Sequence, residues 1–242
     1  MLGGFFVYVI MKAMRKGKFI VIEGTDGSGK SEQTIRLVSR LKKKDLNVSV
    51  FDFPRYDEPS SYFIKEYLNG RFGTLEEIHP KTASLFYALD RYAASADVRS
   101  ALERGEIIVS NRYVASNLGH QGSRFSDENE RKSYFLWDYD LEYGTNGIPK
   151  PDCNIVLFVP PEMAQSLVDR KEERKYLGGK KRDLHEADLN HLTKTYEVYR
   201  ELVRLYPDDF VAVECVEQGK LLTIEEIHEK VWKEASKVLF KP

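Results

Sequence analysis

The sequence contains little cysteine: Cys153 and Cys215 are the two examples in 242 residues. Both lie inside apolar, strand-like runs, where a small side chain packs readily into a protein core. We therefore expect neither a disulfide framework nor a cysteine metal site. Such sparse use of cysteine fits a reducing compartment, and the sequence predicts a cytoplasmic protein.

The sequence also has almost no net charge. It holds 37 Lys and Arg against 38 Asp and Glu, a formal charge of −1. A chain of this balance has no overall field that would attract nucleic acid. We expect no nucleic-acid partner, and any anion must be bound by a local site.

The N-terminus lacks an apolar run long enough to cross a membrane. Residues 2–11 are apolar apart from glycines, which is too short for a spanning helix. Basic residues follow this run, whereas a signal peptide carries its charges before it. We expect no membrane partner and interpret residues 1–16 as an extension upstream of the natural start at Met11 or Met14. A short extra strand or an interface segment is the alternative.

The chain does have a regular alternation of strand-like and helical segments. It is 42% hydrophobic and 31% charged, which is ordinary for one α/β domain of this length. The alternation predicts a parallel sheet with helices on both faces. No linker divides it, so we expect residues 17–242 to form a single domain. The expected strands are Lys18–Glu23, Asn47–Phe53, Ile107–Asn111, Asn154–Val159 and Phe210–Glu214.

The most informative motif is Gly-Thr-Asp-Gly-Ser-Gly-Lys-Ser at Gly24–Ser31, directly after the first expected strand. It matches the P-loop pattern, in which glycines let backbone N–H groups surround a phosphate chain at a helix N-terminus. Lys30 is expected to reach the β- and γ-phosphates, and the Ser31 hydroxyl to bind Mg²⁺. The alternative is a glycine-rich turn before an ordinary helix, but the flanking segments favour a nucleotide site. The residues expected to bind ATP are Gly24, Thr25, Asp26, Gly27, Ser28, Gly29, Lys30, Ser31 and Glu32.

Residues 32–44, which follow the motif, have the apolar spacing of an amphipathic helix. The residues expected on its apolar side are Ile35, Leu37, Val38 and Leu41.

A second, longer helical pattern runs over residues 80–104. It places Ala83, Tyr87 and Arg91 near one face, at positions i, i+4 and i+8. An aromatic ring and a guanidinium one turn apart can stack on a base and bond its edge. The alternative is that Tyr87 packs in the core and Arg91 pairs with Asp90 or another acid.

Two arginines follow expected strands at the edge where parallel sheets bind ligands. Arg55 comes after Phe53 and Pro54, and Arg112 follows the third strand. A guanidinium in this position suits a bidentate grip on phosphate. For Arg55 the alternative is a turn arginine that faces solvent.

The segment from Arg170 to Asp183 is strongly basic, with seven Lys or Arg against three acids, and Gly178-Gly179 lies inside it. A glycine-hinged basic segment near a phosphate site suggests a lid that closes over the ligand. A solvated charged loop is the alternative. We expect the lid at about residues 170–186.

Together these motifs resemble the thymidylate kinase family of P-loop nucleoside-monophosphate kinases, over nearly the whole chain from Lys18 onward. The resemblance rests on Gly24–Ser31, Phe53-Pro54-Arg55, Leu89-Asp90-Arg91 and residues 112–117, in that order. It implies a P-loop NTPase-type three-layer sandwich with a five-stranded parallel sheet and a short basic lid. It also implies transfer of the ATP γ-phosphoryl group to dTMP, giving dTDP, with Mg²⁺ as cofactor and a homodimer as the assembly.

The resemblance assigns roles to residues on the acceptor side. Tyr87 matches the ring that stacks on thymine, and Arg91 matches the donor to thymine O4. Arg55 and Arg112 match the pair that holds the acceptor phosphate. The remaining matches are Phe53 and Pro54 beside Arg55; Ser116 and Asn117 at the base edge; His120 and Glu186 near the sugar; Asp26 near the 3′-hydroxyl and the metal; and Arg170, Arg174 and Arg182 around the phosphates.

The chain departs from the family pattern at two positions. Asn111 stands where an aspartate usually precedes the Arg-Tyr pair, which removes a charge from a metal-organising position. His120 stands where a tyrosine is usual. The P-loop has Gly27 where some members have arginine, so the lid is expected to supply the catalytic positive charge.

Two other functions remain open at this point. One is the same chemistry on another monophosphate or a deoxynucleoside, although an arginine pair for phosphate favours a monophosphate. The other is a nucleotide-binding switch or regulatory ATPase with no small acceptor.

Overall fold

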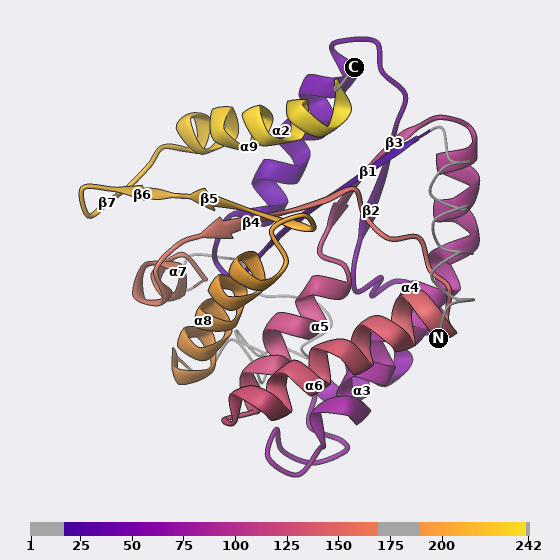
Figure 1. The fold of residues 1–242 in the computed structure, drawn as a ribbon, viewed down its shortest axis with the longest axis vertical. Helices are drawn as coiled ribbons and strands as arrows, with labels where there is room; N and C mark the ends of the chain where they lie inside the picture. Colours follow the sequence, from indigo (N-terminus) through magenta and orange to yellow (C-terminus); the bar gives the residue numbers. More distant parts are fainter. Residues whose placement is uncertain (1–16, 169–188, 241–242) are drawn as a thin grey trace.

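The computed structural model describes residues 17–168 and 189–240, which form a parallel sheet between two layers of helices (Figure 1). The strands follow the order β2-β3-β1-β4-β5. Because β1 lies between β3 and β4, the chain winds outward from it in both directions, and the carboxyl end of β1 is where such sheets bind ligands. The five strands are β1 (Lys18–Gly24), β2 (Val48–Asp52), β3 (Ile107–Asn111), β4 (Cys153–Phe158) and β5 (Phe210–Glu214).

Strand β1 shows why the sheet needs cover on both faces. Its side chains alternate between the faces, and Phe19, Ile20, Val21 and Ile22 are all fully buried. Ile20 and Ile22 pack with Leu37 and Leu41 of α2 (Lys30–Lys42) and with residues of α9 (Ile224–Leu239).

The opposite face of the sheet carries the helices that line the cavity described below. Phe19 and Val21 pack with Ala94 and Val98 of α4 (Pro80–Glu103) and with residues that follow β3. The cover continues with α5 (Val114–His120), α6 (Glu128–Tyr139) and α8 (Leu189–Leu205), which lie below the sheet in Figure 1. The smaller elements are η1 (Pro59–Ser61), α3 (Tyr62–Leu68), η2 (Gly122–Arg124), the π-helical turn η3 (Asp140–Thr145) and α7 (Pro161–Val168).

The predicted fold class is confirmed, and the five expected strands agree with the observed ones to within a residue at each end. The structure adds a short hairpin, β6 (Val216–Glu217) with β7 (Lys220–Leu221), that the sequence pattern did not indicate. Cys153 lies in β4, but Cys215 lies just after β5 rather than inside a strand. Both thiols are buried and neither forms a disulfide, and burial raises the pKa of each to about 12.

The prediction that Ile35 lies on the apolar side of its helix is wrong. Its side chain is 64% exposed, whereas Leu37 and Leu41 are fully buried. Two residues along a helix turn the side chain by roughly 200°, so Ile35 and Leu37 point to opposite sides. Ile35 lies instead at the mouth of the cavity described below.

None of the helices in the described part of the chain is long and apolar enough to cross a membrane. The expected N-terminal extension and the expected lid, with Arg170, Arg174, Arg182 and Glu186, lie outside the described residues.

Candidate functional site

The loop after β1 forms a backbone cradle at the start of α2. Gly29 is the N-cap of α2 and has a left-handed φ of 86°, with open space where a Cβ would stand. Lys30 is buried, and its Nζ donates a hydrogen bond of 2.7 Å to the Thr25 carbonyl. The loop therefore offers backbone N–H groups, a helix N-terminus and an ammonium group to one anion.

Gly27 holds the opposite side of the loop against α7. A Cβ at this position would stand 2.0 Å from the carbonyl oxygen of Ala164. A side chain such as arginine there would require α7 to move, so glycine is a packing requirement in this chain.

A cavity of about 590 Å³ opens from the P-loop towards α4 and α5. The predicted residues that line it come from four separate segments of the chain. They are Asp26, Gly27, Gly29, Lys30, Ser31, Glu32, Phe53, Pro54, Tyr87, Arg91, Arg112, Ser116, Asn117 and His120. One space thus joins the P-loop to most of the residues expected to bind the acceptor.

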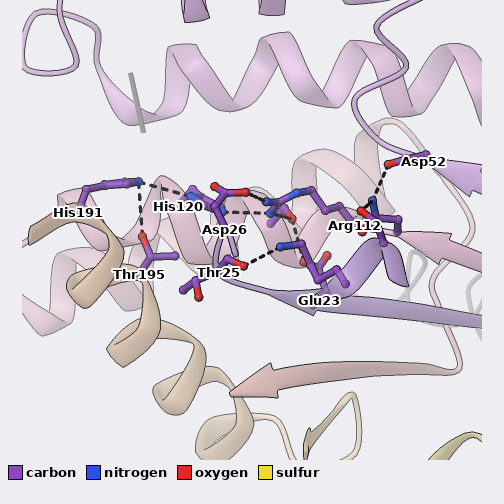
Figure 2. Close-up of polar contacts among 12 residues, drawn as sticks. Glu23, Thr25, Asp26, Asp52, Arg112, His120, His191 and Thr195 are labelled. Atoms are coloured by element: carbon purple, nitrogen blue, oxygen red, sulfur yellow. Dashed lines mark hydrogen bonds and ion pairs between the residues drawn. The ribbon is translucent and has the colours of Figure 1, made fainter. Parts of the chain in front are cut away.

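Arg112 is the centre of a polar row that crosses this cavity (Figure 2). Its guanidinium forms an ion pair with Asp26 and donates to Ser116 Oγ at 3.2 Å; Nη1 also lies 3.1 Å from His120 Nε2. Burial alone would lower the pKa of Arg112, but the carboxylate of Asp26 outweighs it and the pKa is raised. Arg112 therefore remains a cation in the site.

His120 continues the row towards α8. Its Nδ1 lies 3.4 Å from Nε2 of His191, and the two rings are tilted with centroids 5.6 Å apart. Figure 2 shows His191 at one end of the row and Asp52 at the other.

The backbone of Arg112 is unusual, with a positive φ of 65° that is strained for a residue with a Cβ. Glu23, fully buried at the end of β1, fixes the next peptide by accepting from the Tyr113 N–H at 2.7 Å. The same carboxylate accepts from Ser116 Oγ at 2.8 Å and Tyr199 Oη at 2.9 Å. Three elements thus hold the turn that presents Arg112.

Arg91 is held by a buried carboxylate from a distant segment. Its Nε donates to Glu142 Oε1 at 2.9 Å, Nη2 binds the same oxygen, and Arg91 is only 2% exposed. Burial would lower the pKa of Arg91, but Glu142 outweighs burial and the pKa is raised. Arg91 therefore pairs with an acid, as one interpretation of the sequence expected. It also lines the cavity, which is the position that the other interpretation, contact with a base, requires.

Asp138 lies beside this pair and is fully buried. Burial first, and then the nearby Glu142, raise the pKa of Asp138 well above its usual value. One of its oxygens accepts from Asn117 Nδ2 at 3.3 Å. This bond connects the Arg91–Glu142 pair to a residue that lines the cavity.

Tyr87 is half-buried between the cavity and a small apolar cluster. It packs against Ile64, Leu68, Ala83 and the edge of Tyr67, whose ring centroid is 6.3 Å away. The ring thus has one side supported by the protein and lines the cavity with the other.

The side chain of Arg55 is placed differently from those of Arg91 and Arg112, which line the cavity. Its neighbours Pro54 and Tyr56 line the cavity, while its guanidinium contacts Asp90 at 3.2 Å and Ser60 Oγ at 3.0 Å. The Arg55 N–H also donates to Asp90 at 2.8 Å. The interpretation of Arg55 as a solvent-facing turn residue is therefore wrong: it is ion-paired with Asp90 and only 19% exposed, but it is not one of the residues that line the cavity.

Oxygen donors gather where β2 and β3 end beside the P-loop. Asn111 Nδ2 lies 3.4 Å from Ser31 Oγ and 2.9 Å from Asp52 Oδ1. The Oδ1 of Asn111 is buried and has no hydrogen-bond partner among the described residues. Mg²⁺ is bound by few protein oxygens together with phosphates, and Ser31 Oγ and the Asp52 carboxylate are oxygens of this kind that line the cavity. The part of the chain that the structure describes shows no group of three or more His, Cys, Asp or Glu placed to hold a metal.

Four acids in this site were missed by the sequence analysis: Glu23, Asp52, Asp138 and Glu142. Glu23 did carry a signal, because a charged residue that ends a buried strand needs specific partners. Glu142 lies in an aromatic-rich stretch, residues 134–143, that the structure places mainly in the core.

Comparison with known proteins identifies the relatives of this chain. A family model described as thymidylate kinase matches residues 22–231. A thymidylate kinase of Mycobacterium tuberculosis is 32% identical over 184 residues, covering 76% of this chain and 84% of the relative. One of Plasmodium falciparum is 28% identical over 228 residues, covering 94% of each.

A solved structure agrees with these sequence matches. The thymidylate kinase of Candida albicans superposes with a TM-score of 0.68 at 22% identity, covering 92% of both chains, and so has the same fold. Since the family model spans most of the residues and the P-loop and acceptor motifs meet in one cavity, the chain belongs to the thymidylate kinase family.

Proposed function

We propose that this chain carries out the reaction of its family, transfer of the γ-phosphoryl group of ATP to dTMP to give dTDP. It is an ATP-dependent nucleoside-monophosphate kinase. The observation that carries the proposal is the single cavity that joins the P-loop to Tyr87, Arg91 and Arg112. Phosphoryl transfer needs two phosphates aligned in one water-poor space, and this cavity offers an anion site at each side.

On the donor side, the P-loop N–H groups and Lys30 bind the ATP phosphates. Ser31, with the nearby oxygens of Asn111 and Asp52, would hold Mg²⁺. The ion would supply positive charge to neutralise the charge that develops on the phosphates during transfer. The acceptor is already an anionic phosphate, so no side chain needs to act as a strong base.

On the acceptor side, Arg112 binds the dTMP phosphate and Tyr87 stacks on the base. Arg91 donates to thymine O4, and Asn117 and Ser116 contact the opposite edge. An arginine facing O4 favours thymine or uracil over cytosine, which presents a donor there. Arg55 lies beside the lining residues Pro54 and Tyr56, and it would reach the phosphate by exchanging its contact with Ser60.

A coupled assay over a panel of acceptors tests the proposal. With ATP and Mg²⁺ fixed, we expect dTMP to give the highest kcat/KM, ahead of dUMP, UMP, dCMP and thymidine. ATP turnover that is independent of every acceptor would contradict the proposal and favour a regulatory ATPase. Faster turnover of thymidine than of dTMP would assign a deoxynucleoside kinase instead.

We further propose a cytoplasmic homodimer. Leu85, Leu89 and Tyr92 are 40%, 51% and 52% exposed and follow each other at i, i+4 and i+7 on α4. A second copy of the chain would cover this apolar stripe. Light scattering tests the idea: Leu89→Glu should yield monomers, and a native chain that is monomeric at micromolar concentration would contradict it. The two buried cysteines form no disulfide, which supports a reducing compartment.

A further inference from the structure

One of the residues that line the cavity, Asn117 of α5, is held by partners deeper in the protein. Its Nδ2 donates to the Ser84 carbonyl at 3.2 Å and to Asp138 Oδ1 at 3.3 Å. An amide nitrogen has two hydrogens and accepts nothing, so these two contacts use its full capacity. Asn117 is 3% exposed, and its Oδ1 accepts no hydrogen bond from the described residues. The amide therefore turns an acceptor, not a donor, towards the cavity.

The direction of this amide follows from the chemistry of its partners. A backbone carbonyl only accepts hydrogen bonds, so the atom that Asn117 turns towards Ser84 must be the nitrogen. Turning the amide over would place its oxygen against the Ser84 carbonyl, and two acceptors would face each other. Asp138 accepts through Oδ1 whether it is ionised or carries its proton on Oδ2, so it favours the same direction in either state.

Helix α6 holds both the backbone and the side chain of Asn117. The hydroxyl of Tyr134, on this helix, donates to the Asn117 carbonyl at 3.1 Å and lies 2.8 Å from Ser84 Oγ. Asp138 follows Tyr134 by four residues and so lies on the same side of α6, one turn further on. The tyrosine thus places the residue, and the aspartate helps to set the direction of its amide.

Arg91 and Asn117 together match one edge of a pyrimidine. The guanidinium of Arg91 offers only donors, and the amide of Asn117 offers an acceptor. Thymine and uracil present an acceptor at O4 and a donor at N3, whereas cytosine presents a donor at C4 and an acceptor at N3. With its amide turned over, Asn117 would instead donate to N3 of cytosine. The direction of the amide therefore contributes to the choice between these bases.

We propose that Asp138 is a positioning residue for base selection: by accepting from Asn117 Nδ2 it keeps the amide oxygen towards the base, and so favours dTMP over dCMP. The inference rests on the proposed function, because it takes the base to lie between Arg91 and Asn117. Asp138 is fully buried and does not line the cavity, so it acts through Asn117 and makes no contact with the substrate.

The test is equilibrium binding of dTMP and dCMP to the full chain, measured by calorimetry in EDTA without ATP. Asp138→Leu replaces the carboxyl by an apolar group of similar shape and removes the acceptor. It should lower the ratio of dTMP affinity to dCMP affinity about tenfold, the order of one or two neutral hydrogen bonds. The Ser84 carbonyl remains in the variant and keeps part of the preference.

Three further variants separate positioning from packing. Asp138→Asn keeps an Oδ1 acceptor and should retain the native ratio to within about twofold. Asp138→Ala removes the acceptor without adding volume, so it should lower the ratio even where leucine packs badly. Asp140→Leu makes the same exchange at an exposed position two residues away and should leave the ratio unchanged. A merely structural role for Asp138 would weaken dTMP and dCMP equally and would not move the ratio.

Nuclear magnetic resonance of the native chain tests the direction of the amide without a substitution. The side-chain N–H signals of Asn117 should exchange with solvent at least about tenfold more slowly than those of exposed Asn129, with or without dTMP. Rapid exchange in the absence of dTMP would show that the nitrogen faces the cavity, and would overturn the proposal.

The binding ratios distinguish this proposal from the proposed function. A native ratio in folded Asp138→Leu or Asp138→Ala, while the native chain prefers dTMP, would overturn the role of Asp138 and leave the proposed function standing. An equal loss of preference in Asp138→Asn would likewise overturn it, because that variant keeps the acceptor. A native chain that binds neither nucleotide, or that prefers dCMP, would overturn both.

Discussion

The donor side and the acceptor side of the cavity are built in different ways. The donor side is a contiguous loop that presents mainly backbone groups to the cavity, with Lys30 as its main side chain. The acceptor side consists of arginines from separate segments, and each is fixed by a carboxylate: Arg55 by Asp90, Arg91 by Glu142 and Arg112 by Asp26. A site made of backbone groups is formed once its own loop has folded. A site made of arginine side chains also needs carboxylate partners that hold the guanidinium groups in place.

Removing Lys30 should give the largest effect and should damage the donor side alone. Lys30→Ala removes charge stabilisation of the transferring phosphoryl group, and we expect kcat to fall about 1,000-fold. The melting temperature should change little, because Lys30 makes a local bond to Thr25. Steady-state kinetics with a thermal melt check both; turnover within tenfold of native would contradict the P-loop assignment.

Removing Arg91 should break the acceptor side in both function and stability. Loss of a buried contact to the base is worth about 2–3 kcal/mol, so Arg91→Ala should raise the KM for dTMP about 50-fold and the KM for ATP less than threefold. Glu142 would lose its buried counter-ion, which should destabilise the fold by about 3 kcal/mol.

Arg91→Lys separates these two effects. It keeps the buried charge and should recover most of the stability, but a single ammonium cannot reproduce the planar guanidinium contacts, so the KM for dTMP should stay high. Equal rises in KM for both substrates would contradict the assignment of Arg91 to the acceptor.

Asp138 offers a smaller and purely electrostatic test of the acceptor side. Because the folded-state pKa of Asp138 is raised, its contribution to stability is present below the unfolded value of about 3.9 and is lost as pH rises towards the folded pKa. Asp138→Asn should remove this loss, so its stability should fall less between pH 5 and pH 8 than that of the native chain. Denaturant unfolding across that range measures the slopes, and parallel slopes would show that Asp138 is ionised in the folded protein.

The same contrast explains how much could be predicted from sequence. Gly24–Ser31 is recognisable because all its parts are adjacent and its flanks set the strand and the helix. The arginines could be predicted from their places after strands and along a helix. Their partners could not, because Glu142 is 51 residues from Arg91 and Asp26 is 86 residues from Arg112. Only the packing of α4, η3 and the turn after β3 brings those carboxylates to the guanidinium groups.

The departure at Asn111 shows the limit of judging one position by itself. The sequence indicated a lost negative charge at the end of β3, but strand register puts Asp52 directly beside it. Charge balance in this site is a property of neighbouring strands, which a linear pattern does not contain.

We expect the described part of the acceptor side to be in place before ATP or metal binds, because carboxylates already hold its cations. Calorimetric titration of dTMP into the chain in EDTA, without nucleotide, tests it most directly. We predict one dTMP bound per chain, with a Kd that changes less than about threefold when a non-hydrolysable ATP analogue and Mg²⁺ are added. No detectable dTMP binding until the analogue is present would contradict the claim and would mean that the donor side organises the acceptor side.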